Sequence, residues 1–429
     1  MAIQNQSEPP SAGSKGTVLV VGGGIVGLAS AYYLAKAGWN VTIVDKGDFS
    51  DNCSYGNAGM IVPSHFTPMA APGIVAQGIK WLFNSRSPFY VKPSPSLSLI
   101  SWGLKFLRHA NVQHVTRSAP HILALNNLSK ELYDELATEL DGDFGLEHRG
   151  ILMLYKTPKT AKEEIHLAEQ AKSLGLDVAV LNSQEVQALE PDVQLDVLGA
   201  VHYRCDAHLY PPALIDRLTA RVKRLGVTMV PHAAVTGFRR SNGKITDVVT
   251  ASGSFPADLV VLTGGAWLQG LAKGSGLRIP LMPGKGYSFM TAAFEGKVKH
   301  PALLLEARVA LTPMGGKVRI GGTMELAPIN HRINIKRVEG IVNAIPDYYP
   351  EYRLPMPDSR EIWHGFRPCS PDGLPYLGRS KSVDNLIVAG GMGMMGLSLG
   401  PAAGKIVSEL AQGDRLSADI NLFRPDRFQ

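Results

Sequence analysis

Residues 17–47 read TVLVVGGGIVGLASAYYLAKAGWNVTIVDKG, and this stretch decides the fold. Its first five residues form an apolar, β-branched run that predicts a buried strand, and a glycine-rich turn follows directly. The run rich in Ala and Leu over residues 25–37 predicts a helix that Gly38 ends. A second predicted strand, NVTIV, ends at Asp45. Strand, turn, helix and strand in this order predict the start of a doubly wound α/β sheet.

The glycines of the turn follow the G-x-G-x-x-G spacing. Gly22 permits a tight turn, Gly24 lets the backbone approach a pyrophosphate, and Gly27 lets helix and strand pack closely. At the end of the second strand, Asp45 can accept hydrogen bonds from ribose hydroxyls and would repel a 2′-phosphate. The stretch therefore predicts a site for an adenosine dinucleotide such as FAD or NAD rather than NADP.

Two later stretches also place a glycine turn after a predicted strand, where open α/β sheets bind ligands. They are ADLVVLTGGAWLQGL (257–271) and GGMGMMGLSLGPAAGK (390–405). The second is one residue too short for a phosphate loop, and Ile406 stands where that loop needs Ser or Thr. It leads instead into an apolar helix that Gly413 could cap, and we expect the beginning of this helix to face the cofactor.

Length and composition predict a globular protein of two domains, because the chain has 429 residues, 45% of them hydrophobic and 19% charged. Three cysteines form no disulfide framework, which favours a reducing, cytoplasmic compartment. They do not cluster with histidines, so we expect no metal. Residues 1–16 are polar and are predicted to be a disordered leader. The apolar run at 17–35 is interrupted by glycines, which favours strand, turn and helix over a membrane span.

One segment supplies the positive charge of the chain. Residues 52–130 contain seven Lys and Arg and no Asp or Glu, whereas the whole chain carries a net charge of +6. Within it Leu97, Ile100, Leu104 and Leu107 share one helical face. Two interpretations stay open: a helix packed on the protein's own core, or peripheral contact of residues 66–111 with the inner face of the cell membrane. Nucleic-acid binding is not expected, since no recognition motif accompanies these sparse basic residues.

Six stretches together resemble the FAD-dependent D-amino-acid dehydrogenase family, within the larger superfamily of glycine and sarcosine oxidases. They span most of the chain and read VVGGGIVGLASAYYLAKAG, SYGNAGMIVPSHFTPMAAPG with IKWLF after it, PGKGYSF, VRIGGTME, GFRPCSPDGLPYLG and the closing glycine-rich helix. The resemblance implies a flavoprotein oxidoreductase of amino-acid catabolism, acting on CH–NH2 or CH–NH groups. Its reaction is oxidative deamination: hydride passes from the α-carbon of a D-amino acid to flavin N5, the imine is hydrolysed to a 2-oxo acid, and electrons go to a quinone or another acceptor.

The fold implied by the resemblance is a Rossmann-like FAD-binding domain interleaved with a smaller α+β substrate domain on an antiparallel sheet. The FAD-binding domain is assigned residues 17–90, 205–278 and 360–429. The substrate-binding domain takes residues 91–204 and 279–359. Within the latter, residues 120–140 and 158–175 are expected to be helical.

The resemblance also implies flavin contacts from several parts of the chain, with the loop CSYGNAGMI (53–61) running along the flavin ring. Relatives with covalent flavin use a cysteine several residues before the position of Cys369, so we expect FAD to be bound non-covalently. Relatives often carry histidine where Met392 stands. The expected cofactor-binding residues are Gly22, Gly24, Ile25, Val26, Gly27, Asp45, Lys46, Asn57, Ala58, Gly59, Met60, Val235, Gly264, Gly265, Trp267, Gly391, Met392, Gly393, Met395, Gly396, Leu397 and Ser398.

Arg367 and Tyr287 are the predicted catalytic residues. Arg367 is expected to bind the substrate carboxylate through its guanidinium, with the SPDG turn (370–373) fixing its direction. Tyr287 could donate a second hydrogen bond. A structural salt bridge for the arginine and a core position for the tyrosine stay open as alternatives. Relatives often have a further arginine at the place of TPMGG (312–316), and its role could fall to Arg308, Arg319 or Arg332.

Three hypotheses about function remain open. The first is the D-amino-acid dehydrogenase. The second is an oxidase that uses O2 on glycine, sarcosine or an imino acid such as D-hydroxyproline. The third is a flavin-carrying subunit of a hetero-oligomeric dehydrogenase. Because no carboxylate near the motifs could pair with a basic substrate, neutral, small-to-medium D-amino acids or imino acids are favoured.

Overall fold

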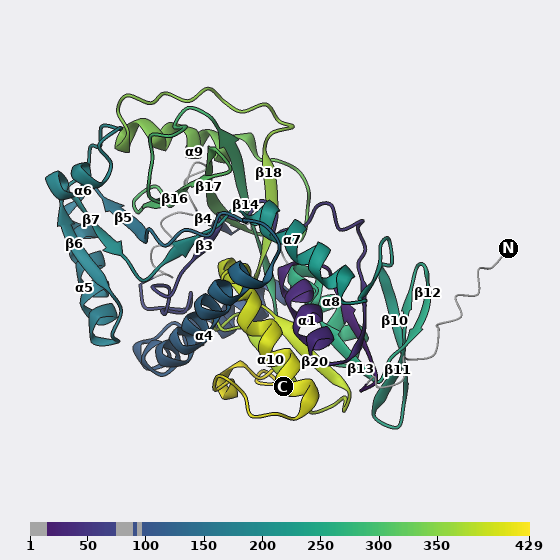
Figure 1. Cartoon of the computed structure of the whole chain (residues 1–429). Coiled ribbons are helices and arrows are strands. Elements are labelled where there is room, and N and C mark those ends of the chain that lie inside the picture. The colour runs from purple at the N-terminus through teal and green to yellow at the C-terminus, as the bar shows by residue number, and fades with distance from the viewer. Residues whose placement is uncertain (1–14, 74–88, 92–96) are drawn as a thin grey trace.

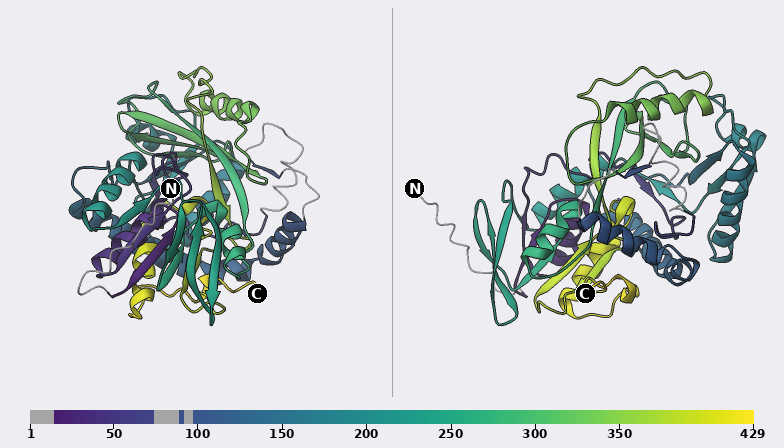
Figure 2. Two further views of the ribbon diagram at one scale, coloured as in Figure 1. Left: turned by 90° about the vertical axis from the view of Figure 1, so that its right-hand side faces the viewer. Right: turned by 180° about the vertical axis from the view of Figure 1, so that it is seen from behind.

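The computed structural model describes residues 15–73, 89–91 and 97–429. Most of the predicted leader and the stretch IKWLF lie outside these residues. Two large sheets, each with helices packed on it, form the two halves of the molecule (Figure 1, Figure 2). The glycine-rich stretches belong to one half and the strand with Arg367 to the other, so the boundary between the halves is where the predicted site must lie.

The first sheet has six strands, and five of them are parallel. Its order is β19 (Tyr376–Arg379), β20 (Leu386–Gly390), β13 (Leu259–Leu262), β1 (Thr17–Val21), β2 (Asn40–Val44) and β9 (Thr228–Val230), with β19 antiparallel to β20. The parallel strands are short, continuous apolar runs because both faces of the sheet are covered. Since β20, β13 and β1 are neighbours, their three glycine turns meet at one edge.

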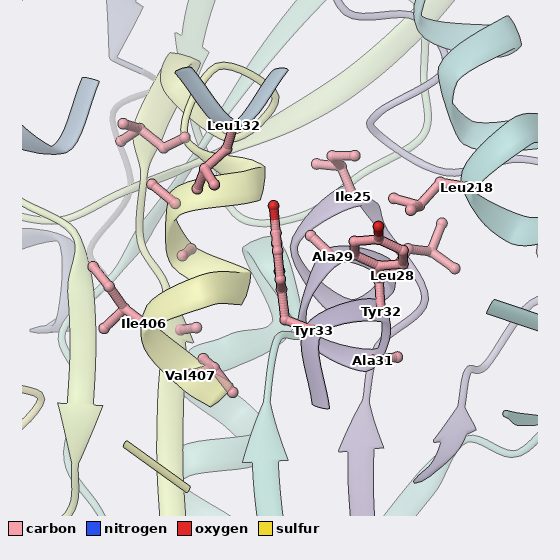
Figure 3. Close-up of a cluster of buried hydrophobic side chains, with 14 of the residues drawn as sticks. Ile25, Leu28, Ala29, Ala31, Tyr32, Tyr33, Leu132, Leu218, Ile406 and Val407 are labelled. Carbon is pink, nitrogen blue, oxygen red and sulfur yellow. The ribbon is translucent and has the colours of Figure 1, made fainter. Parts of the chain in front are cut away.

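Four helices share an apolar core with one face of this sheet. They are α1 (Ile25–Lys36), α4 (Val112–Glu139), α7 (Pro211–Arg224) and α10 (Gly400–Gln412). Figure 3 shows Tyr33 of α1 between α1 and α10, and Ile406 and Val407 on α10 belong to the same core. The two helices approach closely because α10 carries glycine at the contact: a Cβ on Gly404 would stand 2.5 Å from the backbone of Ala29.

The other face of the sheet is covered by α8 (Leu268–Gly274) and a small antiparallel sheet. That sheet contains β10 (Val235–Ser241), β11 (Lys244–Thr250) and β12 (Gly253–Pro256), and it projects at the right of Figure 1. The turn SNGK (241–244) joins its first two strands in an antiparallel hairpin.

The start of α4 corrects the predicted helix over 120–140. The helix begins at Val112 because the side chain of Asn111 accepts a hydrogen bond from His114 N at 2.9 Å, and it continues through Pro120. The second predicted helix of that segment is α5 (Pro158–Ser173). Apolar side chains of α4 belong to the core with α1 and α10, although its residues lie within 91–204. The domain boundary in that segment stays a prediction.

The second sheet has nine strands and is mostly antiparallel. Its order is β18 (Trp363–Cys369), β14 (Met282–Thr291), β17 (Lys317–Leu326), β16 (Val309–Met314), β15 (Ala302–Leu304), β5 (Ile151–Tyr155), β7 (Gly199–Tyr203) and β6 (Val178–Asn182), with β4 (Phe89–Val91) paired to β17. The β15–β5 and β17–β4 pairs are parallel. Helix α9 (Ile335–Tyr348) packs on one face and forms a second apolar core with it.

The remaining elements are short or lie at the periphery. They are α3 (Leu97–His109), α6 (Ser183–Leu189), the pair β3 (Met60–Ile61) and β8 (Ala207–His208), and the 3-10 helices η1 (Gly265–Trp267), η2 (Gly393–Met395) and η3 (Asn421–Phe423). None of the helices in the described part of the chain is both long and apolar enough to cross a membrane.

Candidate active site

The turn between β1 and α1 has the geometry that its glycines predict. Gly22 has φ +114° and donates its N–H to Val44 O at 2.9 Å. A Cβ on Gly27 would stand 1.8 Å from the carbonyl oxygen of Gly22, so only glycine fits there. The hydroxyl of Thr263, from the turn after β13, donates to Gly22 O at 2.9 Å. Two of the glycine turns are therefore bound to each other.

The beginning of α1 leaves room for a pyrophosphate. Its N-cap is Gly24, in extended conformation, with no side-chain cap and no acidic residue in the first turn. A Cβ built on Gly24 would meet only Ser54 Oγ within contact range, at 3.6 Å. The N–H of Ile25 donates to Ser54 Oγ at 3.1 Å, and the other N–H groups of the first turn, together with the positive end of the helix dipole, suit an anion at this position. The residues present thus fit the diphosphate of a dinucleotide.

Asp45 shapes the loop that would receive the adenosine. Its two oxygens accept hydrogen bonds from Gly23 N at 2.6 Å and from Gly47 N at 2.8 Å. Each carboxylate oxygen keeps further acceptor capacity for ribose hydroxyls. The next residue, Lys46, lies over the ring of Trp267 at 3.2 Å from its centroid. Val235, at the start of β10, packs against the core on the face of the first sheet that α8 covers.

The loop over residues 53–60 is fixed from the second sheet. Arg319 of β17 donates to Tyr55 O at 2.7 Å and to Asn57 O at 2.6 Å. Ser288 of β14 donates to Gly56 O at 3.0 Å. Burial lowers the pKa of Arg319 to about 10, so it stays a cation at neutral pH. Its partners show that Arg319 braces this loop through backbone carbonyls.

The loop itself is shaped by local hydrogen bonds and close backbone approach. Asn57 Oδ1 accepts from Gly59 N at 2.9 Å, and Gly59 has φ +76°. A Cβ on Gly59 would stand 2.2 Å from Leu209 O. Ala58 precedes this glycine, and Met60 starts β3, where it pairs with His208. The loop is thus fixed by its own hydrogen bonds and by the pairing of β3 with β8, and its contact with the flavin stays a prediction.

The stretch after β20 reaches the same place. Gly391 and Gly393 have φ +67° and +54°, and an isolated bridge joins Met392 to Cys369 at the end of β18. Ser398 Oγ accepts from Val62 N at 3.1 Å, which ties this stretch to the end of the loop before it. The hydroxyl of Tyr133 donates to Leu397 O at 2.6 Å. Residues 391–398 therefore lie beside both β18 and the loop that begins at Cys53.

The helix that was expected to begin in this stretch starts only at Gly400, where α10 follows η2. Residues Gly391, Met392, Gly393, Met395, Gly396, Leu397 and Ser398 form the turn and the 3-10 helix before it. Gly413 ends α10 with φ +73°, so the predicted cap is confirmed. At the start of α10 the N–H of Gly400 donates to Leu397 O at 3.1 Å and that of Ala402 to Ser129 Oγ at 3.4 Å, and a Cβ on Gly400 would stand 2.7 Å from Ile25 Cγ1.

Arg367 lies at the centre of these contacts. Its guanidinium lies flat over Gly286 of the neighbouring strand β14, where a Cβ would stand 2.1 Å from Nη1. Nη1 donates to Thr323 O at 2.7 Å. No carboxylate pairs with this guanidinium among the residues that the structure describes. Burial lowers the pKa of Arg367 from its ordinary value. A desolvated cation with unused donors is an anion-binding group.

The structure does not bring Tyr287 to Arg367. Tyr287 lies on the other face of β14, in the core with α9, and its hydroxyl accepts from Asn334 N at 3.1 Å. The core position that the sequence left open therefore describes this residue. Among the further arginines considered, Arg308 and Arg332 are exposed, and Arg319 is the loop brace described above. The SPDG turn is present, closed by a hydrogen bond from Gly373 N to Ser370 O at 3.2 Å.

The remaining predicted contacts lie near these groups or belong to the core. Gly264 and Gly265 form the turn after β13, and Gly265 has φ +51°. Ile25 is buried in the core of Figure 3, and Val26 packs at its edge. Trp267 contacts Phe366 edge to face, with ring centroids 5.9 Å apart. This contact links the end of β13 to the strand that carries Arg367.

Two groups were missed from the sequence, Arg319 as a brace and Thr323 as the acceptor for Arg367. Both lie in VRIGGTME, where the alternation of a strand gives no sign of a hydrogen bond to another segment. Within the described residues, no group of three or more His, Cys, Asp or Glu side chains could hold a metal ion.

A family model described as FAD dependent oxidoreductase (DAO) matches residues 17–410. A D-amino acid dehydrogenase of Vibrio atlanticus is 31% identical over 420 residues, which are 95% of this chain and 99% of that protein. One of Helicobacter pylori is 30% identical over 413 residues, with 95% and 98% covered.

Among solved structures, glycine oxidase from Geobacillus kaustophilus superposes with a TM-score of 0.77 at 23% identity, covering 96% of this chain and 99% of that one. L-proline dehydrogenase from P. horikoshii superposes with a TM-score of 0.74 at 20% identity, covering 97% and 98%. At these identities the likeness concerns the fold.

Proposed function

The chain belongs to the DAO family of FAD-dependent oxidoreductases, and from this premise we propose that it oxidises D-amino acids to 2-oxo acids by deamination. The observation that carries the proposal is the half-buried guanidinium of Arg367, which has no carboxylate partner among the described residues. The curated relatives at 30–31% identity, named D-amino acid dehydrogenases over nearly their whole length, support it.

The residues around FAD have separate tasks in this proposal. The turn from Gly22 to Gly27 and the start of α1 would hold the diphosphate, and Asp45 would hold the ribose. The loop around Asn57 and the stretch 391–398 would hold the flavin ring. Bound there non-covalently, FAD would supply the acceptor for the hydride of the substrate α-carbon.

Arg367 binds and orients the substrate. Its bond to Thr323 O uses one of five N–H donors, which leaves the fork free to bind a carboxylate bidentately. Low local polarity around the guanidinium strengthens this ion pair. Fixing the carboxylate fixes the direction of the α-carbon, and orientation of this kind is a large part of the catalysis that a protein can add to cofactor chemistry. Released imine is then hydrolysed to the 2-oxo acid and ammonia.

The experiment follows products and acceptors. Purified protein reconstituted with FAD is incubated with neutral D-amino acids, with a soluble quinone in one arm and only O2 in the other. Formation of 2-oxo acid and ammonia at the rate of quinone reduction, with little peroxide in the O2 arm, is the expected result. Peroxide formed as fast as 2-oxo acid in the O2 arm would identify an oxidase instead. No product in either arm would contradict the proposal.

We also propose that α3 contacts an anionic membrane surface. Leu97, Ile100, Leu104 and Leu107 are 83%, 52%, 63% and 53% exposed and lie on one side of the helix. On its other side Trp102 is buried and donates its indole N–H to Cys369 O at 2.9 Å. An apolar stripe beside the exposed Arg108 suits insertion at the level of lipid headgroups. Such contact would bring the site close to a quinone dissolved in the membrane.

This second proposal is tested by sedimentation with vesicles that contain phosphatidylglycerol. The double variant Leu104→Ser and Leu107→Ser should bind them less than the wild type. Leu198→Ser serves as the matched control because Leu198 is 51% exposed and lies on another part of the molecule. Equal binding of the double variant and the wild type would contradict the membrane contact.

A further inference from the structure

Thr323, next to Arg367, has an unusual backbone conformation. It has φ +62°, a left-handed conformation that costs energy for every residue with a Cβ and most for a β-branched one. Glycine would adopt it freely, and Gly321 and Gly322 come directly before it in the chain. A strained residue of this kind persists where its surroundings hold it in place, and such residues concentrate at functional sites.

The strain has a structural origin in a β-bulge. Between β14 and β17 the pairing passes from Lys285 opposite Glu325 to Tyr287 opposite Gly322. Strand β17 therefore has one more residue than β14 in this interval, and Thr323 with Met324 opposes Gly286 alone. A bulge interrupts the ladder and turns a backbone group away from it. Here the carbonyl of Thr323 accepts from Arg367 Nη1 instead.

The bulge also decides which way Thr323 faces. A Cβ on Gly322 would meet Ile341 of α9, and Glu325 pairs with Arg337 of the same helix, so both of these positions face α9. The two residues between them then face the opposite side of the sheet. Met324 confirms this, since its Cγ lies against Gly284 on the face that carries Arg367. Thr323 and Arg367 thus share the face that looks toward the loop at residues 53–60.

The hydroxyl of Thr323 is buried without a partner. The residue is 8% exposed, and its Oγ1 finds no hydrogen-bond partner among the described residues. A buried hydroxyl without a partner lowers stability, so it does not serve the fold. The backbone carbonyl of the same residue accepts a hydrogen bond from Arg367, a half-buried cation that has no carboxylate partner among the described residues. A ligand carboxylate would satisfy both groups at once.

On this basis we propose that Thr323 Oγ1 donates a hydrogen bond to the substrate carboxylate and acts with Arg367 as its second anchor. This inference rests on the proposed function, since the carboxylate is that of the amino acid. Thr323, at the bulge, then makes the second contact to the carboxylate that the sequence analysis assigned to Tyr287 or to a further arginine. The backbone carbonyl and the side chain of one residue then act together: the carbonyl orients the guanidinium, and the hydroxyl binds the ligand.

Three variants separate the hydroxyl from the backbone. Thr323→Val keeps the shape and removes the hydroxyl, Thr323→Ser keeps the hydroxyl, and Thr323→Gly removes both the side chain and the strain. Thr312→Val is the matched control, because Thr312 on β16 is fully buried and its hydroxyl also lacks a partner among the described residues. The measurement is the anaerobic reduction of bound FAD by D-alanine and by D-proline, followed by rapid mixing.

Thr323→Val and Thr323→Gly should each raise the half-saturating concentration of the D-amino acid about 10-fold or more, as expected for a hydrogen bond to a charged group. The half-saturating concentration of Thr323→Ser should stay within a few-fold of the wild-type value, and that of Thr312→Val should not differ from it. FAD affinity should be unchanged in all four. Thr323→Gly should also melt at a higher temperature than the wild type, which shows that its weaker substrate binding is not a loss of folding.

The two levels of the proposal fail in different ways. If the wild type is reduced by D-amino acids and Thr323→Val saturates at the same concentration, the role of Thr323 is refuted and the proposed function stands. If Thr323→Ser behaves like Thr323→Val, the hydroxyl is not the group that binds the carboxylate, and the inference is likewise refuted. If no D-amino acid reduces the wild type, the proposed function fails and the inference fails with it.

Discussion

Replacing Gly286 by alanine tests the position of Arg367 without touching the arginine. The added Cβ would stand 2.1 Å from Nη1, 2.5 Å from Nη2 and 2.6 Å from Cζ, whereas ordinary contact begins at 3.4 Å. The guanidinium must therefore move away as a whole. Its hydrogen bond of 2.7 Å to Thr323 O cannot survive this displacement. The fold should tolerate the change, because the atoms that yield are the end of a flexible side chain.

A hydrogen bond to a charged group contributes about 1.5–3 kcal/mol, so losing the oriented anchor should weaken substrate binding by roughly 10- to 150-fold. The assay is anaerobic reduction of bound FAD at increasing D-amino acid concentration, with thermal unfolding measured beside it. We expect a higher half-saturating concentration and a melting temperature close to that of the wild type, since alanine suits a strand better than glycine.

Gly284→Ala is the matched control for this variant. Gly284 lies two residues away on the same face of β14, and its added Cβ would meet Met324 Cγ and Cys369 Sγ only at 3.2 Å. Small movements of these side chains absorb such contacts, so the half-saturating concentration should change a few-fold at most. If Gly286→Ala binds the substrate as tightly as the wild type, Arg367 is not the anchor of the carboxylate.

Three further predictions concern the cofactor and stability. Arg319→Met should weaken FAD binding about 10-fold or more, because two hydrogen bonds to the flavin loop are lost, and this is measured by fluorescence titration of the apoprotein. Gly27→Ala should yield protein without FAD, since the added Cβ would stand 1.8 Å from a backbone oxygen that cannot move aside, and the flavin absorbance of the purified protein checks this. Burial raises the pKa of Asp206 to about 7, above its unfolded value. The folded state then binds the extra proton, so this group's contribution, on the order of 4 kcal/mol, is present below about pH 4 and is lost as the pH rises through 7. In Asp206→Asn, the free energy of unfolding measured by chemical denaturation should therefore decrease less between about pH 4 and pH 7 than in the wild type.

Each of these has a contradicting result. Tight FAD binding by Arg319→Met would show that the loop does not need its brace. A yellow Gly27→Ala protein would mean that the turn can open without losing the dinucleotide. If the wild type and Asp206→Asn lose stability in parallel as the pH rises, the carboxyl of Asp206 is not the titrating group.

The first sheet and its glycine turns could be predicted from the sequence because their signals are local. Continuous apolar runs mark strands that are covered on both faces, and glycine spacing marks the turn between β1 and α1. The start of α4 could not be placed, because proline usually stands at the beginning of a helix. This helix instead begins after the N-cap Asn111 and continues through Pro120. Its packing against α1 and α10 depends on contacts far apart in the chain.

The candidate site was predictable only in part. Arg367 has a motif around it, but whether a strand residue faces the candidate site or the core depends on register, and this decides the position of Tyr287. The bulge at Thr323 shifts that register by one residue and leaves no sequence signal other than two glycines. Arg319 likewise could not be told from a surface arginine, because its partners are backbone carbonyls of a distant loop.

The most direct test of the central claim is anaerobic reduction of the FAD-bound protein by the two enantiomers of the same amino acids. Neutral amino acids such as alanine and proline are added as D- and as L-forms, and the flavin absorbance is followed without any acceptor. The account predicts that D-forms bleach the flavin and that the reduced protein is reoxidised by a quinone. Bleaching by L-forms alone would contradict it.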